Sequence, residues 1–183
     1  MRDQIIAAES STRAIVLPDD GIYPNNEQLP LLVYENVLPL SGDEPASQAL
    51  EHFERNGWGD GWVNGMYTFQ HYHSTAHEAI AVVQGSARIQ LGGPEKGITL
   101  YVGRGDVVVI PAGVAHRKLD STGDFAVVGA YPPGQHYDMQ YGKPGERPQA
   151  DERIRRVELP QTDPVFGHEG PLKSHWHGHP PRG

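Results

Sequence analysis

Residues 65–85 read G-MYTFQ-H-Y-H-STAH-E-AIAVVQ-G and decide the fold prediction for this 183-residue chain. His71 and His73 stand one residue apart, Glu78 follows shortly after, and a glycine stands at each end. Because alternate side chains of a strand point to the same face, the two imidazoles should project together from Cα atoms about 6.6 Å apart. Glu78 opens the next apolar run and can add an oxygen ligand from a second strand. The block therefore has the pattern of a metal site.

A second block, GDVVVIPAGVAHRKL, supplies His116 as a further candidate ligand. Taken alone, the pair His71 and His73 is equally compatible with surface or core histidines that bind no metal. Glu78 at a strand entrance and His116 after a Pro-x-Gly turn favour a shared site. Four side chains of types that bind divalent cations would then lie on three neighbouring strands. We therefore predict one metal ion, with four ligands: His71, His73, Glu78 and His116.

The charge balance is acidic, and the chain has no cysteine. It carries 15 Lys and Arg against 23 Asp and Glu, a formal net charge of −8. This balance argues against binding to nucleic acid or to an anionic membrane. The lack of cysteine excludes disulfides, zinc–thiolate sites, iron–sulfur clusters and cysteine nucleophiles. A metal ion must therefore be held by nitrogen and oxygen ligands.

Short strands joined by tight turns dominate the chain from residue 61 onward. The 22 Gly and 16 Pro residues include many that separate short apolar runs. These runs are WVNGMYTFQHYH, EAIAVVQ, SARIQL, GITLYV, DVVVIP, HRKL and FAVVGAY. The pattern predicts an all-β sandwich or jelly roll rather than alternating strands and helices. The continuous VVV and AVV runs predict strands that are buried on both faces.

The length suits a single domain, in which we expect three segments. Residues 1–57 are expected to form an N-terminal extension with a strand at 31–37 and one helix. Residues 58–131 carry both histidine blocks and should form the core of the barrel. Residues 132–183, rich in Pro, Gly and charge at first, should form an irregular C-terminal extension.

The expected helix lies within SGDEPASQALEHFERNG, residues 41–57. Ser41 or Asp43 can cap it, and Pro45 suits its first turn. In the C-terminal extension, residues 154–159 are expected to form a short strand or a segment packed against the rest of the chain.

No segment indicates export or insertion into a membrane. The stretch MRDQIIAAESSTRAIVLPDDG lacks the continuous apolar core of a signal peptide. No apolar run approaches the ~20 residues needed to cross a bilayer. We therefore expect a cytoplasmic protein.

The two histidine blocks resemble the paired motifs of the cupin superfamily. The first matches cupin motif 1, G-x5-H-x-H-x4-E-x6-G, at every position. The second is similar to motif 2, G-x5-P-x-G-x2-H, through Gly105, Pro111, Gly113 and His116. An asparagine often follows four residues later in that motif, and Asp120 stands there instead. The resemblance implies a jelly roll of roughly six to eight strands around a metal centre of three His and one Glu.

A narrower resemblance extends through most of the chain. Stretches such as PNNEQLPLLVY, FERNGWGDGW, HYHSTAHEAIAVVQGSARIQLGG and DPVFGHEGPL are similar to the bacterial YjlB-like cupins. This likeness supports the fold and the site but implies no particular substrate. The cupin resemblance also implies a homodimer, in which N-terminal strands lengthen the sheet of a partner.

Seven further histidines compete as ligands or have no evident role. His77 should face away from Glu78 in a regular strand, although a bend at the strand mouth would let it replace a predicted ligand. The C-terminal tract His175-Trp176-His177-Gly178-His179 is expected to bind metal only adventitiously. The remaining three are expected at the surface: His52, His136 and His168.

Imidazole and carboxylate ligands suit Fe, Mn, Ni, Co or Zn as a divalent ion. A six-coordinate ion with four protein ligands keeps positions for water, dioxygen or a substrate oxygen. We therefore expect a metal-dependent enzyme that oxidises, isomerises or decarboxylates a small oxygen-rich metabolite, an acid or sugar derivative. One alternative is a small-ligand binding or sensing module in which the metal is structural or holds the ligand. Another is an interaction scaffold with a vestigial site.

Overall fold

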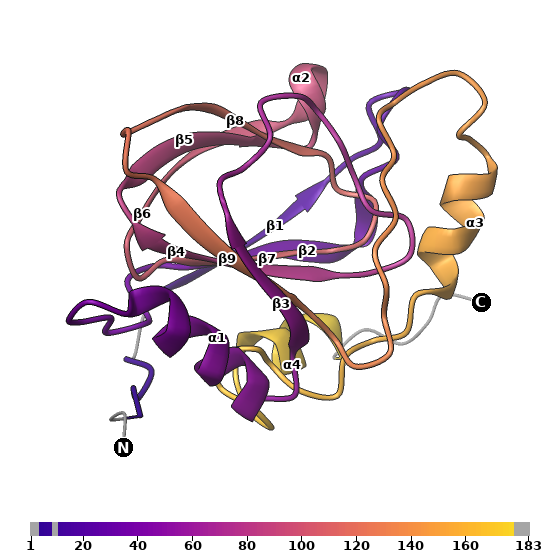
Figure 1. Cartoon of the computed structure of the whole chain (residues 1–183). Helices are drawn as coiled ribbons and strands as arrows, with labels where there is room; N and C mark the ends of the chain where they lie inside the picture. The colour runs from indigo at the N-terminus through magenta and orange to yellow at the C-terminus, as the bar shows by residue number, and fades with distance from the viewer. Residues whose placement is uncertain (1–3, 9–10, 178–183) are drawn as a thin grey trace.

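The computed structural model describes residues 4–8 and 11–177, and within them nine strands and four helices (Figure 1). The strands are β1 (Thr12–Leu17), β2 (Asn26–Tyr34), β3 (Gly59–Asn64), β4 (Glu78–Gln84), β5 (Ser86–Leu91), β6 (Ile98–Gly103), β7 (Val107–Ile110), β8 (His116–Ser121) and β9 (Ala126–Tyr131). The helices are α1 (Pro45–Arg55), α2 (Gly93–Lys96), α3 (Gln149–Arg156) and α4 (Pro171–Trp176).

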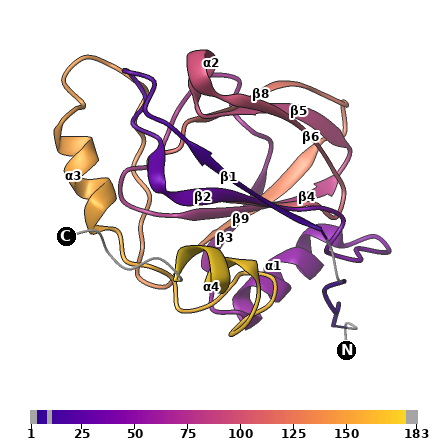
Figure 2. The same cartoon turned by 180° about the vertical axis from the view of Figure 1, so that it is seen from behind.

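The strands form two antiparallel sheets that lie over one another (Figures 1 and 2). The larger sheet has the order β1-β2-β7-β4-β9-β3, and the smaller has the order β6-β5-β8. Pairs such as β2 with β7 and β4 with β9 join strands far apart in the sequence, as in a jelly roll. The prediction of an all-β jelly roll is confirmed. β1 is an edge strand of the larger sheet, where the predicted pairing with a partner subunit would take place; the homodimer stays a prediction.

The central strands of the larger sheet are buried on both faces. In β4, Ala79, Ala81 and Val83 belong to an apolar cluster that also contains residues of α1 and α4. Ile80 and Val82 belong to a second cluster, which joins residues of both sheets. Because alternate residues of a strand point to opposite faces, each face of β4 contributes to a different core. This confirms the prediction made from the continuous apolar runs.

Helix α1 covers the outer face of the larger sheet (Figure 1). It buries Ala49 and Phe53 against that face. The predicted cap is wrong: Glu44 occupies the N-cap position, and no side chain caps the helix. Instead, the side-chain amide of Gln48 hydrogen-bonds both the N–H and the carbonyl of Ser41, which fixes the turn before the helix.

The C-terminal segment is mostly irregular, as predicted, but contains two short helices. Of the two alternatives given for residues 154–159, the strand is wrong, because the first three of these residues belong to α3. In the run QADERIRR, Ala150 and Ile154 are four residues apart and share a face, while Gln149 and charged residues occupy the other positions. Ala150 is fully buried. The spacing of these apolar residues is that of a helix rather than a strand.

A buried carboxylate fastens the C-terminal segment to the larger sheet. Asp163 is fully buried and accepts four hydrogen bonds. The donors are the hydroxyl of Tyr34 at 2.6 Å and the backbone N–H groups of Val165 at 2.7 Å, Phe166 at 3.0 Å and Leu172 at 3.1 Å. All four donors lose water on folding, so the carboxylate is needed to satisfy them.

No helix among the described residues is both long and apolar enough to cross a membrane. The cytoplasmic location stays a prediction.

Replacing Tyr34 by Phe should destabilise the fold. The substitution removes one hydrogen bond to a buried carboxylate and should lower the free energy of unfolding by about 1.5 to 3 kcal/mol. Chemical denaturation followed by circular dichroism measures this change. Tyr101→Phe is the matched control, because Tyr101 is 77% exposed and its hydroxyl should contribute little. Equal stabilities for the two variants would contradict the anchoring role of Asp163.

Candidate metal centre

The backbone around the first two histidines is extended but is not a regular strand. The predicted long strand ends at Asn64, where β3 ends. Beyond it, His71 pairs in an isolated bridge with His116, and Tyr72 pairs with Gln140. These single bridges preserve the alternation of side chains, because the backbone is extended locally. His71 and His73 therefore face one cavity, whereas Tyr72 points away and its hydroxyl lies 3.3 Å from Glu146.

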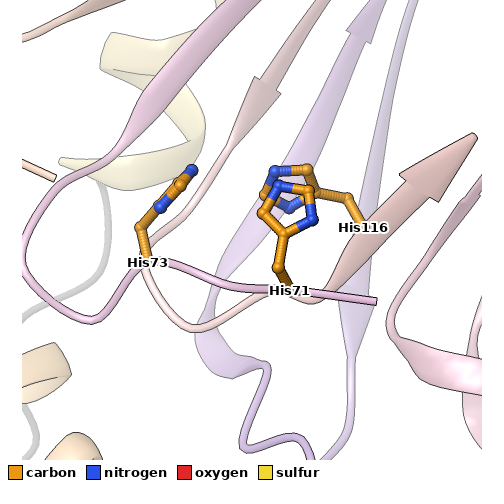
Figure 3. A group of neighbouring side chains, drawn as sticks. All are labelled: His71, His73 and His116. Atoms are coloured by element: carbon orange, nitrogen blue, oxygen red, sulfur yellow. The ribbon is translucent and has the colours of Figure 1, made fainter. Parts of the chain in front are cut away.

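Three imidazoles meet in that cavity. His71, His73 and His116 are buried, and their candidate ligand atoms all lie within 4.8 Å of one another. The ring centroids of His71 and His116 are 4.1 Å apart, and that of His73 lies 5.3 Å from that of His116. Figure 3 shows the three rings on the same side of the segment that carries His71 and His73. This buried group is suited to a metal ion.

Backbone carbonyls fix the orientation of all three rings. The Nδ1 atom of His71 lies 3.1 Å from the carbonyl oxygen of Phe69, and that of His116 lies 3.0 Å from the carbonyl of Val114. The Nδ1 atom of His73 lies 2.6 Å from the carbonyl of Asp138. A carbonyl only accepts, so each Nδ1 carries the proton and the Nε2 atom keeps its lone pair. Each imidazole is thus held in the tautomer that can ligate a cation through Nε2.

Glu78 brings a carboxylate next to two of these histidines. Its Oε1 atom lies 3.4 Å from Nε2 of His116 and 3.5 Å from Nε2 of His73. Its other oxygen, Oε2, accepts a hydrogen bond of 2.8 Å from the hydroxyl of Tyr131. That hydroxyl in turn accepts a hydrogen bond of 2.8 Å from the indole N–H of Trp62. The carboxylate is therefore oriented with one oxygen toward the histidines and the other toward Tyr131.

A glycine makes room for this chain of hydrogen bonds. Trp62 of β3 is paired with Gly129 of β9, and a Cβ atom at Gly129 would lie 2.3 Å from the indole ring. Only a residue without a side chain lets the indole lie across β9 and reach Tyr131. Gly113 has a comparable role beside the other block, because its φ is +97° and a Cβ there would lie 2.4 Å from the carbonyl oxygen of Asn25. The turn before His116 can therefore pack closely against that loop.

Burial and mutual contacts set the protonation of the group. Burial, together with the neighbouring His116, lowers the pKa of His71 to about 3. Burial also acts to lower the pKa of His73, but the carboxylate of Glu78 outweighs it and the pKa is raised. Burial acts to raise the pKa of Glu78, yet His73 and His116 outweigh it, so the pKa lies well below its ordinary value. At neutral pH the cavity thus holds a carboxylate beside imidazole nitrogens.

The loop after β9 holds His73 from outside. Besides accepting from His73 through its carbonyl, Asp138 accepts from the backbone N–H of Ser74 at 2.6 Å and from the Ser74 hydroxyl. Arg153 of α3 donates to the same hydroxyl oxygen at 2.9 Å. The segment predicted as an irregular C-terminal extension therefore contributes directly to the position of a candidate ligand.

The cavity has a volume of about 370 Å³ and opens beside the three histidines. Its wall comes from β3, β4, β8, β9, the loop before His71 and the loop after β9. The lining residues are Trp62, Asn64, Gly65, Met66, Tyr67, His71, His73, Glu78, Ile80, His116, Tyr131, Tyr137 and Met139. A volume of this size is at the lower end of the ~300 to 1,000 Å³ typical of small-molecule sites.

His77 lies outside the cavity, on the opposite face from Glu78. Its ring is buried against Trp176 of α4, with the centroids 4.8 Å apart. Its Nδ1 atom accepts a hydrogen bond of 2.9 Å from the backbone N–H of Ala112, and burial lowers its pKa to about 3. His77 is therefore a neutral core histidine rather than a replacement ligand.

The remaining histidines divide into core and surface residues. The surface prediction for His52 is wrong, because its ring is buried and Nε2 lies 2.7 Å from the carbonyl of Val165. His136 and His168 are exposed, as predicted. In the C-terminal tract, Nε2 of His177 lies 2.7 Å from the carbonyl of Pro160. His179 lies outside the described residues.

Sequence reasoning missed several residues around the centre. The sequence pattern assigns no role to Trp62, Tyr131, Tyr137 or Asp138. The pairing of Ala79 with Ala130 puts Tyr131 across from Glu78, but this register is not visible in the sequence. The role of the Asp138 carbonyl could not be predicted from the sequence, because every residue has a backbone carbonyl.

Comparison with solved structures gives several distant likenesses. The epimerase RmlC from Legionella pneumophila matches 70% of this chain and 74% of its own at 16% identity, with a TM-score of 0.41. An acireductone dioxygenase from Bacillus anthracis matches 52% of this chain and 64% of its own at 14% identity, with a TM-score of 0.39. The oxalate decarboxylase OxdC of Bacillus subtilis matches 61% of this chain and 22% of its own at 18% identity, with a TM-score of 0.35. At these scores the likenesses say nothing about function.

Two sequence comparisons are more informative. Residues 63–137 match the family model described as "Cupin", and this range contains all four predicted ligands. The "Uncharacterized protein YjlB" of Bacillus subtilis (strain 168) is 44% identical over 168 residues. That alignment covers 92% of this chain and 98% of the relative. A relative this similar over nearly its whole length identifies the family: the chain belongs to the YjlB-type cupins.

Proposed function

We propose that the protein is a metal-dependent enzyme that acts on a small oxygen-rich metabolite in the cavity beside His71, His73 and His116. The divalent ion would be held by the Nε2 atoms of these histidines and by Oε1 of Glu78. The observation that carries the proposal is the convergence of three buried imidazoles, whose ligand atoms lie within 4.8 Å of one another and whose rings are oriented by backbone carbonyls. Oε1 of Glu78 lies 3.5 Å from Nε2 of His73 and 3.4 Å from Nε2 of His116.

The spacing of the donor atoms supports this ligand set. Two atoms that each bond one ion at about 2.1 Å lie ~3.0 Å apart at a right angle and ~3.4 Å apart at a tetrahedral angle. The separations from Oε1 of Glu78 to Nε2 of His73 and His116 are 3.5 and 3.4 Å. A cation at the centre of the group would therefore need little movement of these side chains. The cation would also replace the direct contact between Glu78 and His73 by a stronger interaction of each side chain with the cation.

The donor chemistry narrows the ion to Fe, Mn, Co, Ni or Zn, since neutral imidazole and carboxylate suit all of them. A divalent ion in this place acts as a Lewis acid toward a bound oxygen atom. The protein's own contribution is to orient the ligands of the ion and to exclude water. Tyr131 holds the carboxylate of Glu78 in one direction, and the buried side chain of Ile80 and the partly buried Trp62 limit access of solvent.

Loss of one ligand should abolish tight metal binding. His73→Ala and Glu78→Ala should each weaken the affinity for Co(II) or Mn(II) by more than about 100-fold, because loss of an outer partner alone costs 10- to 100-fold. Isothermal titration and elemental analysis of protein made without an affinity tag measure this. His136→Ala is the matched control, since the side chain of His136 is 83% exposed. Wild-type affinity in the Glu78 variant would remove Glu78 from the ligand set.

Turnover should require the same residues. Fe(II)- or Mn(II)-loaded protein incubated with panels of hydroxy acids, keto acids and keto sugars should convert at least one compound, detected by mass spectrometry. Conversion should disappear in His73→Ala and Glu78→Ala variants whose circular dichroism spectra and thermal midpoints show a folded protein. If the wild-type protein holds metal and binds a compound but never converts it, the chain is a binding or sensing module instead.

A further inference from the structure

The wall of the cavity is apolar and aromatic outside the four candidate ligands. It contains three tyrosines, one tryptophan, two methionines, one isoleucine, one asparagine and one glycine. Two of the polar groups are already engaged, because the hydroxyl of Tyr131 and the indole N–H of Trp62 bond within the chain that ends on Glu78. Asn64 supplies the only side-chain amide in the wall among the described residues.

No cationic side chain lines this cavity in the part of the chain that the structure describes. The two basic residues after His116 are engaged elsewhere. Arg117 donates to the side chain of Gln90, and the ammonium group of Lys118 lies 5.8 Å from the centre of the Phe125 ring. An anionic ligand must therefore be neutralised by the metal ion alone.

Counting charges sets a limit on the ligand. A divalent ion, the carboxylate of Glu78 and three neutral imidazoles sum to one positive charge. A ligand with one negative charge brings the sum to zero. A dianion leaves an uncompensated negative charge among buried apolar groups, which is unfavourable in a medium of low dielectric constant.

Aromatic rings line the cavity next to the candidate ligands. The ring of Tyr137 stacks on that of Tyr131 at a centroid distance of 5.1 Å and forms a T-shaped pair with His73, also at 5.1 Å. Tyr67 stacks on Phe69 at 4.7 Å, and both rings contact His71. Tyr137 and Tyr67 are half-exposed, so the face of each ring that is not stacked on its aromatic neighbour remains available to a ligand.

We propose that the cavity selects a flat, conjugated chelator that carries a single negative charge, such as an α-hydroxyketone in its enolate form. Its two adjacent oxygen atoms would bind the ion, and its planar body would lie between Tyr137 and Tyr67. The inference rests on the proposed function, which it narrows. A small dicarboxylate lacks a cationic partner here, and a sugar would find few side-chain hydrogen-bond groups for its several hydroxyls, namely the Asn64 amide and the hydroxyls of Tyr67 and Tyr137.

Three chelators separate charge from shape. Tropolone is flat and monoanionic, lactate is monoanionic but not flat, and oxalate is flat and dianionic. Each is titrated into Co(II)-loaded protein, whose metal content is measured first, and binding is followed by visible absorption and calorimetry. Tyr137→Ala should weaken the binding of tropolone roughly 2- to 10-fold, because an aromatic contact is lost, and should leave the binding of lactate unchanged. Tyr137→Phe should retain tropolone binding.

A charge placed in the wall supplies the decisive comparison. Met139→Lys should shift the ratio of the oxalate and tropolone dissociation constants at least about 10-fold in favour of oxalate, because a nearby cation compensates the second charge. Met139→Leu is the neutral control of similar size. The intrinsic affinity of each chelator for Co(II) cancels in this ratio.

These measurements distinguish a wrong ligand class from a wrong proposed function. If the protein binds Co(II) but the Lys and Leu variants give the same ratio, or Tyr137→Ala leaves tropolone unaffected, the ligand class is wrong and the metal centre stands. If the wild-type protein binds no Co(II), the proposed function fails and the ligand class fails with it.

Discussion

The candidate metal centre depends on three hydrogen bonds between imidazole Nδ1 atoms and backbone carbonyls. These bonds give His71, His73 and His116 one tautomer and one direction, so that their Nε2 atoms meet. Without them, the three rings would turn in the cavity to relieve crowding or to bond to water. Because the acceptors are carbonyls of the main chain, the geometry is set by the path of the backbone and persists without a metal ion.

The sheets and the segment after β9 position the carboxylate of Glu78 and the backbone carbonyl that bonds His73. The two cores on either face of β4 hold Glu78 at the mouth of that strand. β9 supplies Tyr131, and the absence of a side chain at Gly129 lets Trp62 complete the chain of hydrogen bonds to Glu78. The segment after β9, braced by Arg153 of α3, brings the carbonyl of Asp138 to His73. The irregular segment therefore contributes to the site as much as the sheets do.

Much of the fold and the four candidate ligands could be predicted from sequence, because both follow from short-range patterns. Strand periodicity and glycine turns indicated the jelly roll, and alternation brought His71 and His73 to one side even though the strand there is only a pair of bridges. The partners of His52 and the role of Asp138 depend on carbonyls far away in the chain, which leave no mark on the sequence. Likewise, α3 was missed because its apolar residues are few and adjoin a turn-rich loop.

The most direct test is a crystal structure of the protein, purified without a metal-affinity tag, with anomalous diffraction recorded at the absorption edge of the metal found by elemental analysis. The account predicts one dominant anomalous peak about 2.0 to 2.3 Å from the Nε2 atoms of the three histidines and from Oε1 of Glu78. A peak confined to the C-terminal histidine tract, or histidine rings turned away from one another around an ordered water, would contradict it.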